Sequence, residues 1–228
     1  EFPVDYATVL TVAKCKDALM AGFTTFRDAG SVSEGLKLAF DEGVLPGPRI
    51  YPCGAYISQT CGHGDSEYAH TYRDIQYRHP SSTVLADGVP EIIRAVREQF
   101  YRGASHIKLM ATEILNRHED IRLLFGTDMM ITGPDYQVEQ SEDIRYYEKR
   151  FGTMRALRAL TGTANEVFAL TTYQNPYPKG KIGVLEAGSY ADLLLVDGDP
   201  TKSVSVLADT DHLRLIMKGG TVYKNTLC

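Results

Sequence analysis

The sequence lacks several features that would assign it to a class at once. No apolar run reaches the roughly 18 residues that a membrane-spanning helix needs, and no basic-then-apolar leader opens it. The four cysteines have no CxxC spacing, which fits neither a zinc ribbon nor a dense disulfide framework. The chain has no long basic run and a net charge of −5. We therefore expect neither a nucleic acid nor a membrane as its partner. We therefore expect a small-molecule partner, with free thiols in a reducing, cytoplasmic compartment as the default.

The chain has the composition of a globular protein, and its sequence pattern predicts alternating strands and helices. Hydrophobic residues make up 43% and charged residues 23% of the 228 positions, which suits one α/β domain or a core with a small second lobe. The first half predicts, in order, a helix from Asp5 to Gly22, a strand at 23–27, a helix from Ser31 to about Gly43, a strand at 49–53, a polar loop at 54–87 and a helix from Pro90 to Gly103.

The second half changes from a mixed pattern to short strands. A strand at 121–125 and helices at 153–160 and 163–170 precede strands at 182–185, 191–196, 213–217 and 221–224, the last two joined by a tight Gly219-Gly220 turn. Proline, glycine and polar residues at 174–180 mark the boundary. The sequence thus predicts two domains, residues 1–173 and a small β lobe at residues 174–228.

One lysine stands inside an apolar, strand-like run. In residues 104–112, a period of two places His106, Lys108 and Met110 on one face and Ile107 and Leu109 on the other. Such a lysine either faces solvent from an edge strand or projects into a site. The pattern alone leaves both interpretations open.

Seven stretches together resemble the metal-dependent amidohydrolase superfamily, in particular its imidazolonepropionase-like and prolidase-like branch. They follow the order of that family and cover most of the chain. The stretches are residues 22–28 (GFTTFRD), 47–51 (GPRIY), 57–65 (ISQTCGHGD), 103–108 (GASHIK), 125–128 (FGTD), 188–200 (beginning GSYADL and ending DGDP) and 217–223 (MKGGTVY).

The resemblance implies an α/β fold, a (β/α) TIM-type barrel with its active site at the carboxyl ends of the strands and a small β-sandwich-like lobe. The chain would supply strands resembling the second to fourth and the eighth. Lys108 matches the fourth-strand lysine that becomes a carbamate bridging two divalent metal ions, typically zinc. Asp128 matches the aspartate that binds metal and takes a proton from the attacking water. The implied activity is hydrolysis of a carbon–nitrogen bond in an amide, cyclic amide or dipeptide-like small molecule, and a homo-oligomer is compatible with it.

The chain also departs from the family pattern. It has no His-x-His pair, and the 19 residues between Lys108 and Asp128 are too few for the intervening strands, since one βαβ unit takes about 30 residues. The metal site and the barrel are therefore expected to be incomplete in this chain. Three explanations stay open: a fragment of a full enzyme, a gene prediction that omits an exon, or a non-catalytic remnant produced by an internal deletion.

Other polar residues are weaker candidates. His63 and Asp65, in the long polar loop, and Tyr56 are interpreted as substrate-binding residues, although a simple turn and ordinary packing are alternatives for them. For Asp28 a capping or pairing role is the favoured interpretation, and for His106 a hydrogen-bonded structural role.

Overall fold

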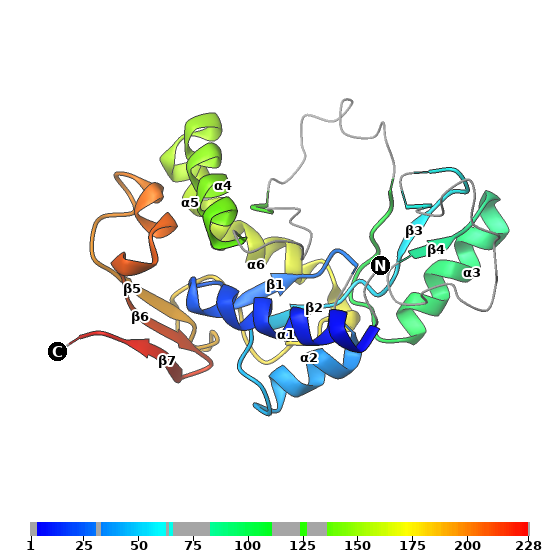
Figure 1. Cartoon of the computed structure of the whole chain (residues 1–228), viewed down its shortest axis with the longest axis horizontal. Helices are drawn as coiled ribbons and strands as arrows, with labels where there is room; N and C mark the ends of the chain where they lie inside the picture. The colour runs from blue at the N-terminus through cyan, green and yellow to red at the C-terminus, as the bar shows by residue number, and fades with distance from the viewer. Residues whose placement is uncertain are drawn as a thin grey trace. The chain divides into compact units, whose positions relative to one another are not determined.

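The computed structural model describes residues 4–30, 33–62, 64–65, 83–110, 124–126 and 136–227 (Figure 1). The chain divides into two compact units: unit 1 comprises residues 1–26, 40–49 and 122–228, and unit 2 comprises residues 27–39 and 50–121. Helices and strands alternate along the chain, which confirms the α/β class. Within the described residues the strands form small sheets of two or three strands and not a closed barrel. The division at residues 173 and 174 stays a prediction.

Unit 1 begins with the helix predicted from Asp5. Helix α1 spans Val4–Met20, and Gly22 follows it with φ 93°, a left-handed conformation that glycine adopts without strain. Leu19, near the end of α1, is fully buried against Leu213 and Ile216 of the C-terminal sheet. This contact ties the first helix of the chain to its last strands. None of the described helices is long and apolar enough to cross a lipid bilayer.

The C-terminal sheet is antiparallel and contains β5 (Leu193–Val196), β6 (Leu213–Lys218) and β7 (Thr221–Asn225), with β6 in the middle. Gly219 and Gly220 both have positive φ, as expected of a two-residue hairpin turn. The predicted strand at 182–185 is wrong. Gly183 adopts φ 78° against the carbonyl group of Thr161, so the backbone bends where extension was expected.

Unit 1 also contains helices and several short 3₁₀ turns between the two ends of the chain. Helix α4 spans Tyr136–Phe151, α5 spans Thr153–Leu160 as predicted, and α6 spans Gly162–Ala169. Short 3₁₀ turns follow: η2 (Thr172–Gln174), η3 (Val204–Ala208) and η4 (Thr210–His212). The core between α4, α5 and η3 contains Ile144, Ala156 and Val204, all nearly or fully buried. Helix α4 was not predicted.

Strand β1 (Thr25–Arg27) pairs with β2 (Arg49–Tyr51), and the Asp28 N–H donates to the Tyr51 carbonyl group at 2.9 Å just beyond them. Helix α2 spans Glu34–Asp41. The Ser33 hydroxyl accepts a hydrogen bond from the Leu36 N–H at 3.3 Å, so Ser33 caps α2. The predicted start at Ser31 is therefore two residues too early.

Unit 2 contains strands within the predicted polar loop. Strand β3 (Tyr56–Ser58) pairs in parallel with β4 (Thr83–Leu85), and Ile57, Ala86 and Ala95 form a small core with helix α3. The loop prediction over residues 54–87 was therefore wrong at these two strands. Helix α3 spans Gly88–Tyr101, so Pro90 lies in its first turn and not at its first position.

The apolar stripe predicted for α3 is only partly buried, with Val96 packed on the small core. Ile92 and Ile93 are exposed, whereas Ala95 and Gln99 are buried. The Gln99 side chain accepts a hydrogen bond from the Ala55 N–H at 2.9 Å, and this polar contact orients the helix.

Candidate active site

Lys108 lies on an extended segment beside β3. The Ile57 N–H donates to the Lys108 carbonyl group at 2.9 Å, and the Met110 N–H donates to the Ile57 carbonyl group at 3.0 Å. These two bonds flank a single parallel bridge between Ile57 and Leu109, so the segment is not the full strand that was predicted. Ile107 packs on the core as expected, but Leu109 is 52% exposed.

His106 forms a hydrogen bond between this segment and Asp28, the residue that follows β1. Its Nε2 lies 2.9 Å from the Asp28 carbonyl oxygen, and its Nδ1 lies 3.1 Å from the Ser105 hydroxyl. Ser105 in turn donates from its hydroxyl to the Pro52 carbonyl group at 3.0 Å. Burial, reinforced by the charge of Arg27, lowers the pKa of His106 to about 4 despite the bond to Asp28. His106 is thus a neutral structural residue, in line with its interpretation from the sequence.

Cys53 lies within reach of the Lys108 charge, and Asp28 contacts Cys53. The Cys53 thiol is 3.7 Å from Oδ2 of Asp28, whose Oδ1 accepts the Gly30 N–H at 3.2 Å. Burial raises the pKa of Cys53 to about 12; the Asp28 carboxylate adds to this effect and the Lys108 charge opposes it. Asp28 therefore belongs to the candidate site. Its signal in the sequence was its position directly after a strand.

Tyr56 stands between two glycines. A Cβ atom at Gly64 would lie 2.8 Å from Cε2 of the Tyr56 ring, and one at Gly30 would collide with Cδ1 of the same ring. The ring is only partly buried. The two glycines fix its position next to the turn that carries Asp65, and its substrate-binding role stays a prediction.

The turn after β3 is held by its own polar groups. Asp65 accepts the Cys61 N–H at 2.7 Å and donates its N–H to the Gly62 carbonyl group at 2.9 Å. Thr60 donates from its hydroxyl to Asp87 at 2.7 Å, which connects the turn to the start of α3. His63 lies outside the described residues. The proposed substrate contact of Asp65 stays a prediction, since one of its oxygens already stabilises the turn.

In unit 1, the residues that precede the Asp128 motif are anchored on helices. The Phe125 N–H donates to the Ala159 carbonyl group at 3.3 Å, and its ring lies 4.9 Å from that of Tyr147. The Tyr147 hydroxyl donates to the Leu124 carbonyl group at 3.0 Å. Asp128 itself lies outside the described residues, so its predicted catalytic and metal-binding roles stay predictions.

The described residues do not fit a metal centre on their own. They include no group of three histidine, cysteine, aspartate or glutamate side chains that could hold an ion. His106 is the histidine near Lys108 among the described residues, and both of its ring nitrogens already have partners, so it is not available as a ligand. The binuclear site expected around Lys108 is therefore not assembled by the described part of the chain.

The model of the amidohydrolase family matches residues 2–119, which contain β1 to β4 and the Lys108 segment. The chain belongs to the amidohydrolase family. This confirms the resemblance seen in the sequence.

A curated fungal protein is similar to part of this chain. Ochratoxinase from Aspergillus niger is 38% identical over 108 residues, covering 43% of this chain and 22% of that protein. The chain thus matches about a fifth of the length of that curated relative.

Solved structures show a similar fold at low identity. An amidohydrolase is similar over 100% of this chain and 81% of its own, with a TM-score of 0.78 and 22% identity. A prolidase complexed with N-methylphosphonate-L-proline is similar over 99% of this chain and 81% of its own, with a TM-score of 0.74 and 19% identity. The structure of A. niger ochratoxinase is similar over 100% of this chain and 77% of its own, with a TM-score of 0.71 and 19% identity.

Proposed function

We propose that the intact protein hydrolyses the carbon–nitrogen bond of a small amide, cyclic amide or dipeptide-like substrate. The observation that carries the proposal is the effect of the Lys108 charge on Cys53, whose thiol lies 3.7 Å from Asp28, within the region that matches the amidohydrolase family. The likeness to a prolidase and to ochratoxinase supports this substrate class.

Divalent metal, with zinc as the first candidate, belongs to the proposal as a cofactor of the intact protein. The family is generally metal-dependent, and a carboxylated Lys108 and Asp128 are the proposed ligands. Because the described residues do not complete a metal site, the steps assigned here concern only the chain's own groups.

Asp128 is the proposed proton carrier of the reaction. It takes a proton from the water molecule whose oxygen attacks the carbonyl carbon, and the carbon–nitrogen bond then breaks as Asp128 passes that proton to the leaving nitrogen. Tyr56, His63 and Asp65 are proposed to contact the substrate, with Tyr56 held by Gly30 and Gly64 as described above.

Asp128→Asn in the intact, zinc-supplied protein tests this assignment. The amide keeps the size of the side chain but accepts no proton at neutral pH, so kcat for hydrolysis of dipeptide and cyclic amide substrates should fall by about 10² to 10⁴. Asp211→Asn, an exposed aspartate in η4, is the matched control and should leave kcat unchanged. Wild-type activity in Asp128→Asn would refute the role of Asp128.

A second candidate is a non-catalytic remnant of the fold that binds small molecules, favoured by the absence of a three-ligand group in the described residues. Elemental analysis and intact mass separate the two candidates. Stoichiometric zinc together with the added mass of carbon dioxide on Lys108 would contradict the remnant. Metal-free, unmodified protein that was supplied with zinc and bicarbonate would support it.

A further inference from the structure

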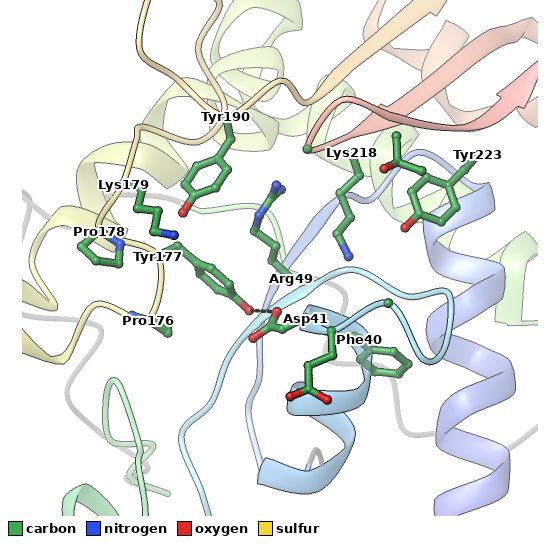
Figure 2. A pocket seen from close by; sticks show the side chains of 14 residues that line it. Phe40, Asp41, Arg49, Pro176, Tyr177, Pro178, Lys179, Tyr190, Lys218 and Tyr223 are labelled. Atoms are coloured by element: carbon green, nitrogen blue, oxygen red, sulfur yellow. Dashed lines mark hydrogen bonds between the residues drawn. The ribbon is translucent and has the colours of Figure 1, made fainter.

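A pocket lies in unit 1, and none of the residues assigned to hydrolysis lines it. It has a volume of about 490 Å³, within the range of small-molecule sites. The pocket lies between the end of α2, the segment at 176–190 and the β6–β7 turn, as Figure 2 shows. All of its lining residues belong to unit 1.

Lys218 brings a buried positive charge to this pocket. It is 9% exposed, and its ammonium group donates to the Gly47 carbonyl group. Among the described residues no carboxylate lies within ion-pair distance of its Nζ atom. An ammonium has three donors, and burying its charge without a counter-charge is costly. The pocket thus contains a buried cation that forms no direct ion pair with a carboxylate of the described residues.

The nearest carboxylates are already engaged. Asp192 forms a buried ion pair with Arg49 and accepts the Gly219 N–H at 2.8 Å. Asp41 accepts the Tyr177 hydroxyl at 2.8 Å, the bond drawn in Figure 2. Burial and the Arg49 charge lower the pKa of Lys218, and the more distant charges of Asp41 and Asp192 only partly offset them. An incoming anion would form the direct ion pair that Lys218 lacks.

The walls of the pocket indicate the shape and polarity of the rest of the ligand. The rings of Phe40, Tyr177, Tyr190 and Tyr223 line it, and the Arg49 guanidinium lies 4.3 Å from the centre of the Tyr190 ring. Aromatic walls of this kind suit a flat apolar body. Lys179 adds an exposed second ammonium to the lining.

We propose that this pocket binds a small aromatic carboxylate, with its anionic group on Lys218 and its ring among the tyrosines. A doubly charged phosphate fits less well, because Asp41 and Glu42 line the same pocket and would repel it. The proposal does not depend on the hydrolase activity.

Calorimetric titration of the purified chain with benzoate, benzamide and inorganic phosphate at constant ionic strength tests the proposal. Benzoate should bind saturably and at least about tenfold more tightly than benzamide, which has the same shape without the charge. Phosphate should bind more weakly than benzoate. Equal binding of benzoate and benzamide, binding of phosphate alone, or no binding at all would overturn the site.

Lysine variants localise the binding. Lys218→Met should weaken benzoate binding at least about tenfold, whereas Lys224→Met should not change it. Lys224 is the matched control, because its ammonium also donates to a carbonyl group, that of Thr210 at 2.7 Å, outside the pocket. Should Lys218→Met fail to fold, Lys179→Met removes an exposed charge and should weaken binding severalfold. Unchanged benzoate affinity in either pocket variant would contradict the assignment.

Discussion

At the residue scale, His106 makes unit 2 sensitive to acid. Its pKa is lowered to about 4 in the folded protein, so below about pH 6.5 the unfolded chain binds a proton that the folded chain does not. The free energy of unfolding should therefore fall as the pH drops from about 6.5 to 4, by on the order of 2 kcal/mol. Urea unfolding across this range measures the loss.

His106→Gln keeps polar atoms at the position but does not titrate, so its stability should lose this part of the pH dependence. His212→Gln serves as the control, since His212 is 45% exposed. A pH profile that is identical in wild type and His106→Gln would show that other groups cause the acid sensitivity.

The Arg49–Asp192 pair is the second prediction at this scale. Both side chains are at most 7% exposed, and the guanidinium lies over the Tyr190 ring. Asp192→Asn leaves the Arg49 charge buried without its partner and should lower the free energy of unfolding by about 3–5 kcal/mol. Glu186→Gln breaks the exposed Lys181–Glu186 pair and should cost less than about 1 kcal/mol, measured by the same denaturation. Similar losses in the two variants would be inconsistent with a buried pair.

At the scale of elements, Glu148 of α4 holds the start of η3. Its carboxylate accepts hydrogen bonds from the Ser203 hydroxyl at 2.9 Å and the Val204 N–H at 2.9 Å, and Ser205 and Thr153 also donate to it. Burial alone would raise the pKa of Glu148, but these bonds outweigh it and lower the pKa to about 2.

Glu148→Gln should reduce the free energy of unfolding at pH 7 by about 1–3 kcal/mol, because it replaces a charged acceptor of several hydrogen bonds. The wild-type contribution is present above about pH 4.5 and should disappear as the pH falls towards 2, so the two proteins should converge in acid. Glu142→Gln, an exposed residue of the same helix, is the control. A constant difference between Glu148→Gln and wild type over this range would refute the explanation.

Elements with local signals were predictable, and those that depend on distant contacts were not. The Gly22 stop and apolar spacing identified α1, and the Gly219-Gly220 pair identified the β6–β7 hairpin. Helix α4 is mostly polar, and its buried Ile144 finds its partners in α5 and η3, which its own sequence does not show. Strands β3 and β4 lie in a stretch rich in glycine, serine, threonine, tyrosine and histidine, which is typical of a loop, and they become strands by pairing with each other across that stretch.

In the candidate site, too, one residue had a local signal in the sequence and its neighbours did not. Lys108 stood out as a charge in an apolar run, and family resemblance supplied its meaning. Asp28 and Cys53 become its neighbours only because β1, β2 and the Lys108 segment end near one another, which is a property of tertiary structure.

At the scale of the whole molecule, each compact unit has a hydrophobic core of its own. Leu213 is fully buried in unit 1 and Ile57 is 3% exposed in unit 2. Replacing either residue with alanine should cost about 2–5 kcal/mol, with the loss of amide hydrogen-exchange protection concentrated in the unit that carries the substitution. Equal loss of protection in both units after either substitution would show that the two cores unfold as one.

The three described cysteines differ sharply in accessibility. Cys15 and Cys53 are buried, and Cys53 stays protonated at neutral pH because its pKa is raised to about 12, whereas Cys61 is exposed in the turn before Asp65. Since thiol-directed dyes attack the accessible thiolate, a chain with Cys228→Ser should be labelled first at Cys61. A fluorophore attached there would report ligand arrival at the turn beside Tyr56 without any change to the residues proposed for hydrolysis.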